Sequence, residues 1–238
     1  MKLKKQKVTI IAEAGINHDG SIKKAIKLIK IAKECGADFV KFQIFNPENV
    51  VTKNAKKSHY QKSSYYDTET QHKMISKYKL EYNLFLKIKK ECKKRKIKFL
   101  CSPFDIQSLQ YLNSIGEKII KIPSGEITNY PYLKLLGSMK KKLILSTGMS
   151  NIPEIRSALR ILTKFGTKKS NITILHCVTS YPAPFEYLNL KAIDLIKLKA
   201  IKKTLSPISY KILYEKKIGV SYARNKYLDY IKNKKVDY

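Results

Sequence analysis

Residues 97–148 read IKFLCSPFDIQSLQYLNSIGEKIIKIPSGEITNYPYLKLLGSMKKKLILSTG, and they show the repeating plan of the chain. Three short apolar runs, at 97–102, 118–124 and 142–148, are separated by segments whose apolar residues recur at helical spacing. Short apolar runs are typical of buried strands, and longer periodic segments are typical of amphipathic helices. Strands that alternate strictly with crossover helices predict a parallel sheet.

The same alternation extends in both directions from this stretch. Further strands are predicted at 8–14, 37–45 and 171–179, and further helices at 21–36, 82–96, from Asn151 and from near Asn189. Between residues 45 and 78 the sequence is polar and has no clear period, which predicts a long loop.

About six βα units in strict order predict an α/β fold of the (β/α)8 TIM-barrel type that is incomplete. A closed barrel of this type takes about 250 residues, and the chain has 238. An open doubly wound sheet is the structural alternative, but no Gly-rich fingerprint follows the first strand.

The chain is strongly basic, with 49 Lys and Arg against 18 Asp and Glu, a formal charge of +31. A nucleic acid or a membrane surface as partner is one interpretation. The lysines are spread over nearly every predicted helix instead of forming one stripe, which favours solvated helix faces. We therefore expect no nucleic-acid partner and no membrane partner, and we expect the charge to attract small anionic substrates.

The sequence predicts a cytoplasmic protein. No apolar run approaches the length of a transmembrane helix, and Glu13 interrupts the short apolar run after the basic N-terminus. The four cysteines have neither metal-type spacing nor a CxxC pair, so we expect reduced structural thiols.

Polar residues stand at the C-terminal ends of the predicted strands, which form the active face of a (β/α)8 barrel. They are Glu13, Lys41, Gln43, Ser102, Lys121, Ser124, Glu126, Ser146, Thr179 and Tyr181. Lys41 and Lys121 lie within apolar strands, and inward-facing lysines are costly without a charged ligand. Hydroxyl groups and exposed backbone N–H groups suit phosphate or carboxylate oxygens. The pattern predicts an anion pocket, with a nearby carboxylate to orient a polyol or move a proton.

Single members of this set also have plainer interpretations. Ser102 and Ser146 are of a type that is common in turns and caps. His176 follows an apolar run and fits a hydrogen-bonded core histidine, and Glu13 fits a cap of the helical segment that follows it. The pair of lysines is the part of the pattern that these interpretations explain least.

Six segments taken together resemble the sialic acid synthase family, which includes N-acetylneuraminate, legionaminate and pseudaminate synthases. They are IAEAGINHDGS (11–21), ADFVKFQIF (37–45), FLCSPFD (99–105), KIPSGEITNYP (121–131), LILSTGM (143–149) and ILHCVTSYPAPFE (174–186). They follow the family's order and spacing from about Thr9 to about Ala192. The resemblance implies a transferase of sialic acid biosynthesis that condenses phosphoenolpyruvate with an N-acetylmannosamine-like sugar and releases phosphate.

The resemblance also implies roles for the strand-end residues. The residues that would hold phosphoenolpyruvate are Lys41, Ser102, Lys121, Ser124, Ser146 and Thr179, the last of which is Asn in some relatives. Glu13 would lie near the reacting carbons and act catalytically, in proton transfer or in orienting water. Gln43, Glu126 and Tyr181 would contact the acceptor sugar.

Two features of the family are not found in this sequence. In the family a divalent metal, Mn or Mg, is held by two histidines in segments like SDHT and EKHFT, and neither segment is present. We also expect this chain to have no C-terminal antifreeze-like domain, on which the family's homodimer depends. We therefore expect no metal ligands in this chain, and a dimer only through a different interface.

The resemblance dissolves after about Lys197. We expect a partial barrel domain over residues 1–197 and a divergent basic tail over 198–238. Without the metal ligands and the last two βα units, the chain alone is expected to have little or no synthase activity. The alternative function is a non-catalytic remnant that binds phosphoenolpyruvate or another anion.

Overall fold

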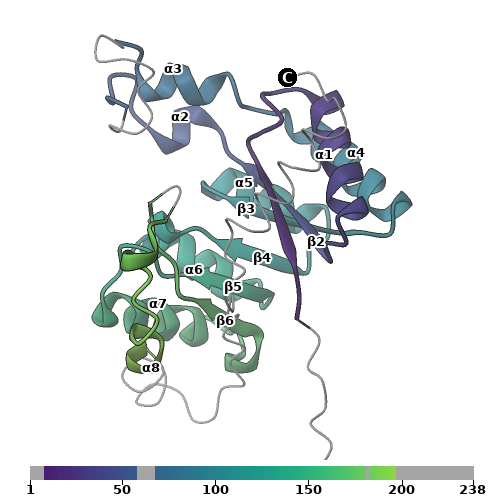
Figure 1. The fold of residues 1–238 in the computed structure, drawn as a ribbon. Helices are drawn as coiled ribbons and strands as arrows, with labels where there is room; N and C mark the ends of the chain where they lie inside the picture. The colour runs from purple at the N-terminus through teal and green to yellow at the C-terminus, as the bar shows by residue number, and fades with distance from the viewer. Residues whose placement is uncertain (1–7, 58–67, 181–182, 197–238) are drawn as a thin grey trace, which may run out of the picture.

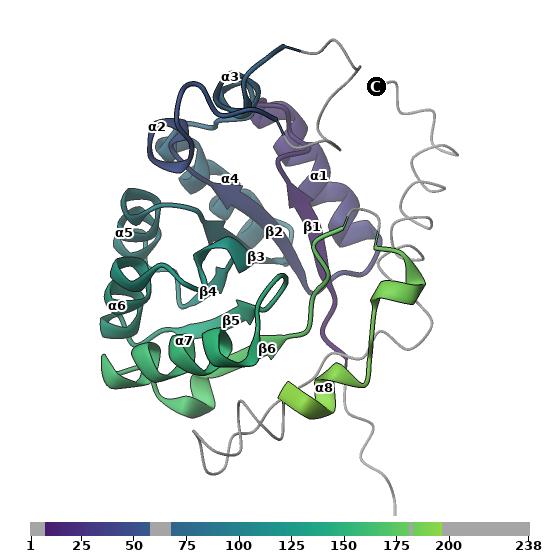
Figure 2. The same ribbon diagram turned by 90° about the vertical axis from the view of Figure 1, so that its left-hand side faces the viewer.

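The computed structural model describes residues 8–57, 68–180 and 183–196. Its strands are β1 (Ile11–Gly15), β2 (Phe39–Ile44), β3 (Lys98–Pro103), β4 (Ile119–Ile122), β5 (Lys142–Ser146) and β6 (Ile172–Leu175). Parallel ladders join β1 to β2 to β3 and β4 to β5 to β6, and β3 lies beside β4. Figure 2 shows the strands as one curved wall. The predicted α/β barrel type, with six βα units, is confirmed.

The longer helices cover the outer face of this wall (Figures 1 and 2). They are α1 (Ile22–Glu34), α4 (Tyr82–Lys94), α5 (Ile106–Ser114), α6 (Tyr130–Ser138) and α7 (Ile152–Lys164). Side-chain caps begin all but α4: Ser21, Asp105, Asn129 and Asn151 each accept a hydrogen bond from the backbone three residues on. Such caps satisfy N–H groups that the first turn leaves unpaired, so they fix where each helix begins.

Strand alternation separates the apolar core from the polar inner face. Both chain neighbours of Lys41 in β2, and both neighbours of Lys121 in β4, are fully buried in two apolar clusters beneath the helices. Because successive side chains of a strand point to opposite faces, the two lysines face the concave side of the wall. The alternation of side chains along β2 and β4 therefore places both lysine side chains on the inner face.

The prediction of a long loop over residues 45–78 is wrong for the described part of the segment, which is partly helical. The described part of this segment contains α2 (Pro47–Val50) and α3 (Gln71–Ser76). Both helices are too short to show a helical period in the sequence. An ion-pair cluster holds the segment together: Glu69 pairs with Lys57 at 2.6 Å and with Lys77 at 2.5 Å.

Helix ends differ from the predictions by a few residues. Helix α4 ends at Lys94 instead of 96, because Arg95 caps it and Lys96 has a positive φ of 55°. The helix expected from near Asn189 is α8 (Ala192–Leu195). The predicted domain boundary at 197/198 and the basic tail lie outside the described residues. No helix in the described ranges is long and apolar enough to cross a membrane.

Candidate active site

A buried lysine and a carboxylate form an ion pair between the first two strands. The β1–β2 ladder places Glu13 directly opposite Lys41, and the Lys41 Nζ contacts the Glu13 carboxylate. The Lys41 side chain is only 10% exposed, whereas that of Glu13 is 51% exposed. Glu13 therefore partly neutralises a buried cation while it stays accessible. The alternative role of Glu13 as a helix cap is wrong, since Ser21 caps α1.

A second lysine, Lys121, lies on the same concave face, near enough for the charge of Lys41 to affect its pKa. Burial and the positive charge of Lys41 lower the pKa of Lys121 from 10.5 to about 8, while Cys177 and Glu13 act in the opposite direction. Within the described ranges, Lys121 has no carboxylate at ion-pair distance. Two lysines and one glutamate leave an excess positive charge on the inner face, which an anionic ligand would neutralise.

A buried hydroxyl adds to this site. Ser102 is the last residue but one of β3 and lies opposite Gln43 of β2, and it is only 1% exposed. Its Oγ has no hydrogen-bond partner among the described residues. A buried polar group without a partner costs about 1–3 kcal/mol. The Ser102 hydroxyl therefore fits a ligand contact better than the turn or cap role that its residue type suggested.

The ends of β4, β5 and β6 meet at a glycine. The Gly148 N–H donates to Ser124 Oγ at 3.1 Å. A Cβ on Gly148 would lie 2.6 Å from Thr179 Cγ2 and 3.0 Å from Ser124 Oγ. Only a residue without a side chain permits this approach, so Gly148 brings together two hydroxyl residues that are 55 positions apart in the numbering. Its packing role was not predicted.

Ser146 lies beside a thiol that the sequence did not assign to the site. Ser146 is 3% exposed, and the Cys177 Sγ–H points to its Oγ at 3.6 Å. Cys177 also raises the pKa of Lys121, so it lies near that lysine as well. Cys92, Cys101 and Cys177 carry free thiols. Strand β6 ends at Leu175, and the chain beyond it turns Cys177 towards the site, which a pattern of residue types does not reveal.

The predicted sugar-binding residues are only partly brought together. Gln43 lies on the inner face beside Ser102 in the β2–β3 ladder. Glu126 lines a separate cavity of about 530 Å³, and Tyr181 lies outside the described residues. Burial raises the pKa of Glu126, and a 2.6 Å hydrogen bond from Asn129 Nδ2 opposes the rise.

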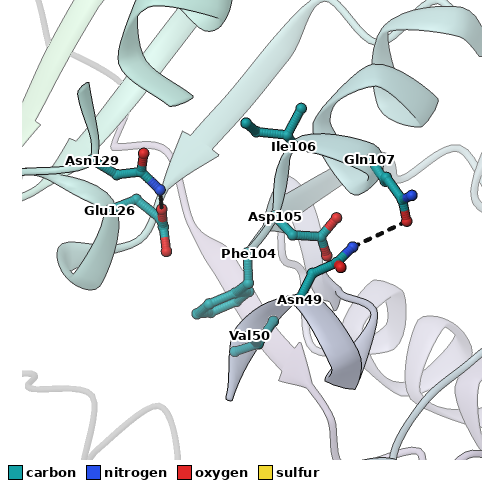
Figure 3. Close-up of a pocket in the computed structure, with 8 residues that line it drawn as sticks. All are labelled: Asn49, Val50, Phe104, Asp105, Ile106, Gln107, Glu126 and Asn129. Carbon is teal, nitrogen blue, oxygen red and sulfur yellow. Dashed lines mark hydrogen bonds between the residues drawn. The ribbon is translucent and has the colours of Figure 1, made fainter. Parts of the chain in front are cut away.

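The cavity beside Glu126 was not predicted (Figure 3). Its walls come from α2, with Asn49 and Val50, from residues Phe104–Gln107 at the start of α5, and from Glu126 and Asn129 after β4. Neither Lys41 nor Lys121 lines it. The cavity lies at the same C-terminal ends of the strands. The ionisable residues that line it are acidic, Asp105 and Glu126. Of its lining residues only Glu126 was among the predicted site residues, and Asn49 and Val50 were missed because α2 was not recognised as a helix.

The described histidines do not form a metal site. His18 is 1% exposed, and its Nδ1 accepts from the Gly20 N–H at 3.1 Å. His72 pairs with Glu48 at 3.1 Å, and the His176 Nε2 contacts the Leu188 carbonyl at 2.8 Å. No cluster of three His, Cys, Asp or Glu residues with the geometry of a metal centre occurs in the described ranges. His176 is thus the hydrogen-bonded histidine that its apolar setting suggested.

Comparison with known proteins gives one consistent group of relatives. The NeuB family model matches residues 28–203. A protein of Campylobacter jejuni named N,N'-diacetyllegionaminic acid synthase is 50% identical over 192 residues, which are 81% of this chain and 58% of that protein. A Drosophila melanogaster protein named N-acetylneuraminate-9-phosphate synthase is 30% identical over 193 residues, which are 81% of this chain and 51% of that protein.

A solved structure of a synthetase from the same group of relatives has a similar fold. The N-acetylneuraminic acid synthetase of Leptospira borgpetersenii, in complex with citrate, superposes with a TM-score of 0.69 at 29% identity and covers 92% of this chain and 72% of that chain. The chain spans about half the length of the curated relatives that it matches. Because the family model matches well over half of its residues, and the strand-end motifs lie within the shared fold, the chain belongs to the NeuB family.

Proposed function

We propose that this chain carries the phosphoenolpyruvate site of a nonulosonic acid synthase, which joins phosphoenolpyruvate to an N-acetylated amino-sugar aldehyde and releases phosphate. The observation that carries the proposal is the pair of inward-facing lysines, Lys41 and Lys121, which share a single carboxylate, that of Glu13, among the residues that the structure describes. Phosphoenolpyruvate has a carboxylate and a phosphate, so it can neutralise both cations at once.

The proposed phosphoenolpyruvate contacts come from successive strand ends. Lys41 and Lys121 supply charge, and hydroxyl contacts come from Ser102, Ser124, Ser146 and Thr179. Ser102 supports this assignment because its buried hydroxyl has no partner in the described part of the chain. Such a preformed set of donors orients the ligand without reorganisation.

In the proposed reaction, C3 of phosphoenolpyruvate attacks the aldehyde carbon, and the aldehyde oxygen takes up a proton. A water then adds at C2, and the tetrahedral intermediate loses phosphate by cleavage of its C–O bond. Glu13 is the candidate for moving the proton or orienting the water. Its carboxylate is half exposed and pairs with Lys41, so it lies beside the proposed ligand.

The proposed sugar contacts are Gln43, Glu126 and Tyr181. The names of the relatives indicate two classes of acceptor sugar. The product named for the Campylobacter jejuni relative is unphosphorylated, and the product named for the Drosophila melanogaster relative carries a 9-phosphate. Both classes contain an N-acetylated amine. The side chain of Glu126 lies in a cavity large enough for part of such a sugar.

A divalent metal would polarise the aldehyde oxygen if one were bound. The residues of this chain do not fit that group, since the two histidine segments are absent and the described histidines lie apart, each with its own partner. We propose that the chain by itself binds phosphoenolpyruvate and has little or no turnover.

The test is calorimetric titration of phosphoenolpyruvate into the purified chain. Lys121→Ala should abolish saturable binding, whereas Lys118→Ala, which removes an exposed lysine next to the same strand, should leave it unchanged. Absence of binding to the parent chain, or equal binding to both variants, would overturn the proposal. A parallel assay of phosphate release separates a working synthase from a protein that only binds the anion.

A further inference from the structure

The two lysines of the inner face have different surroundings. Lys41 of β2 contacts the Glu13 carboxylate, which stabilises an ammonium group. Lys121 of β4 has no carboxylate at ion-pair distance within the described ranges. Both of its chain neighbours, Ile120 and Ile122, are fully buried. Lys121 therefore stands between apolar residues without an anion of its own.

Two features of the fold favour the neutral amine of Lys121. Burial removes water that would solvate an ammonium group. Strands β2 and β4 flank β3 in the wall, so the Lys41 cation lies close enough to repel a second positive charge (Figure 2). Together they lower the pKa of Lys121 to about 8. Desolvation and an adjacent cation are the two means by which proteins turn a lysine into a nucleophile that forms Schiff bases.

The groups around this amine suit a 2-oxo acid. Such a compound has a carbonyl carbon that an amine can attack and a carboxylate that needs a cation. Lys41 supplies a cation when Lys121 is neutral, and the buried Ser102 hydroxyl, which has no described partner, can donate to a carboxylate oxygen. The half-exposed Glu13 carboxylate can take up and return protons. An aldehyde without a carboxylate would leave Lys41 and Ser102 without a role.

We propose that Lys121 forms an imine with the C2 carbonyl of a 2-oxo acid, which gives the anion site a covalent activity. The Lys121 Nζ attacks C2 to form a carbinolamine, and the carbonyl oxygen then leaves as water with the two protons of the amine. A C=N bond replaces the C=O bond, and nothing is oxidised or reduced. The proposal goes beyond the proposed function and does not require phosphoenolpyruvate to bind. Pyruvate is the smallest common ligand of this class.

Reductive trapping with pyruvate tests the proposal. The purified chain is incubated with pyruvate and cyanoborohydride, which adds hydride to C2 of the imine in preference to the free ketone and leaves a stable secondary amine. Peptide mass spectrometry then locates the modified lysines. At about pH 7.5, Lys121 should be labelled about tenfold or more faster than the exposed Lys118, because burial leaves more of its amine neutral than in a solvated lysine.

Two variants separate a nucleophilic lysine from one that is merely accessible. Lys121→Arg keeps a positive charge but has no amine, so labelling in the site should cease while labelling of Lys118 stays unchanged. Lys41→Met removes the neighbouring cation and should raise the pKa of Lys121. The pH at which labelling of Lys121 is half-maximal should therefore move upwards from about 8 in Lys41→Met. Lys118→Met, the control, should leave this midpoint unchanged.

Each outcome decides the proposal. Labelling of Lys121 no faster than that of Lys118 overturns it, as does a midpoint that is the same in the parent chain and in Lys41→Met. Saturating phosphoenolpyruvate should slow the labelling of Lys121, because an anion holds the lysine in its charged form. Rapid labelling that phosphoenolpyruvate does not affect leaves the imine site standing and removes the proposed function. Calorimetric binding of phosphoenolpyruvate without labelling removes the imine and leaves the proposed function.

Discussion

Glu13 and Lys41 face each other across the β1–β2 ladder and form an ion pair between a half-exposed carboxylate and a buried ammonium group. The backbone pairing sets this contact, because parallel strands in fixed register bring residues 28 positions apart to the same level. The carboxylate can therefore act on a ligand at the inner face without leaving its lysine partner.

Replacement of the Glu13 carboxylate should lower the stability of the fold. Glu13→Gln leaves Lys41 buried without an anion, so the free energy of unfolding should fall by about 1 kcal/mol, a figure reduced for the exposure of Glu13. Urea unfolding measures the change. Glu81→Gln, which removes an exposed carboxylate at 3.2 Å from Lys79, should change the free energy by much less. Equal effects of the two variants would contradict a special role for the Glu13–Lys41 pair.

Phosphoenolpyruvate affinity should fall as the pH rises above about 8. The pKa of Lys121 is lowered to about 8, so its positive charge is lost above that pH, and with it one partner of the anion. The affinity should decrease by up to about tenfold per pH unit in this range. Titration calorimetry between pH 7 and pH 9.5 gives the profile. A flat profile would show that Lys121 does not contact the ligand in its charged form.

Removal of the Lys121 charge should stabilise the unliganded protein. Its pKa is lower in the folded chain than the ordinary 10.5, so the unfolded chain binds more protons and the lysine destabilises the fold below pH 8. Lys121→Met should raise the free energy of unfolding at pH 7 by on the order of 2 kcal/mol, and the gain should shrink as the pH approaches 10.5.

The control for this measurement is Lys118→Met, which changes an exposed lysine and should have little effect at either pH. Loss of stability in Lys121→Met at pH 7 would contradict the expected sign and would indicate that Lys121 has a partner that supports the fold.

A methyl group on Gly148 should disturb the anion site. Its Cβ would approach Thr179 Cγ2 to 2.6 Å and Ser124 Oγ to 3.0 Å, so the two side chains must move apart. Gly148→Ala should weaken phosphoenolpyruvate binding by about tenfold, the cost of one misplaced contact. Gly125→Ala is the matched control, since no atom lies within 4 Å of its Cβ position. Equal affinities of the two variants would exclude this packing role.

The Ser102 hydroxyl should be dispensable for folding and needed for binding. Ser102→Ala removes a buried oxygen without a described partner, so the melting temperature of the unliganded chain should stay level or rise. Phosphoenolpyruvate affinity should fall about fivefold or more. Ser108→Ala provides the contrast, because its hydroxyl bonds to Asp105 at 2.7 Å and its loss should lower the melting temperature. A destabilised Ser102→Ala would indicate a structural role instead.

The cavity and its charge are the part of the site that sequence patterns did not predict. Asn49 and Gln107 are 58 positions apart and meet only because α2 packs against α5. Neither residue carries a charge, and Asn49 lies in the polar segment that has no clear period, so no local signal marks the two as a pair. Cys177 was similarly assigned to the structural thiols until its contact with Ser146 placed it beside the lysines.

The sequence by itself determined the order of the six strands and of the longer helices, the barrel type and the identity of the polar strand-end residues. These follow from local periodicity, since apolar alternation and capping residues act over a few positions. Only the tertiary structure decided how these residues are combined: the Glu13–Lys41 pair, the close approach at Gly148, and the cavity beside Glu126. It also left the Ser102 hydroxyl without a partner among the described residues. The physical reason is that strand register and helix packing join residues far apart in the chain, and burial then sets the energy of each charge.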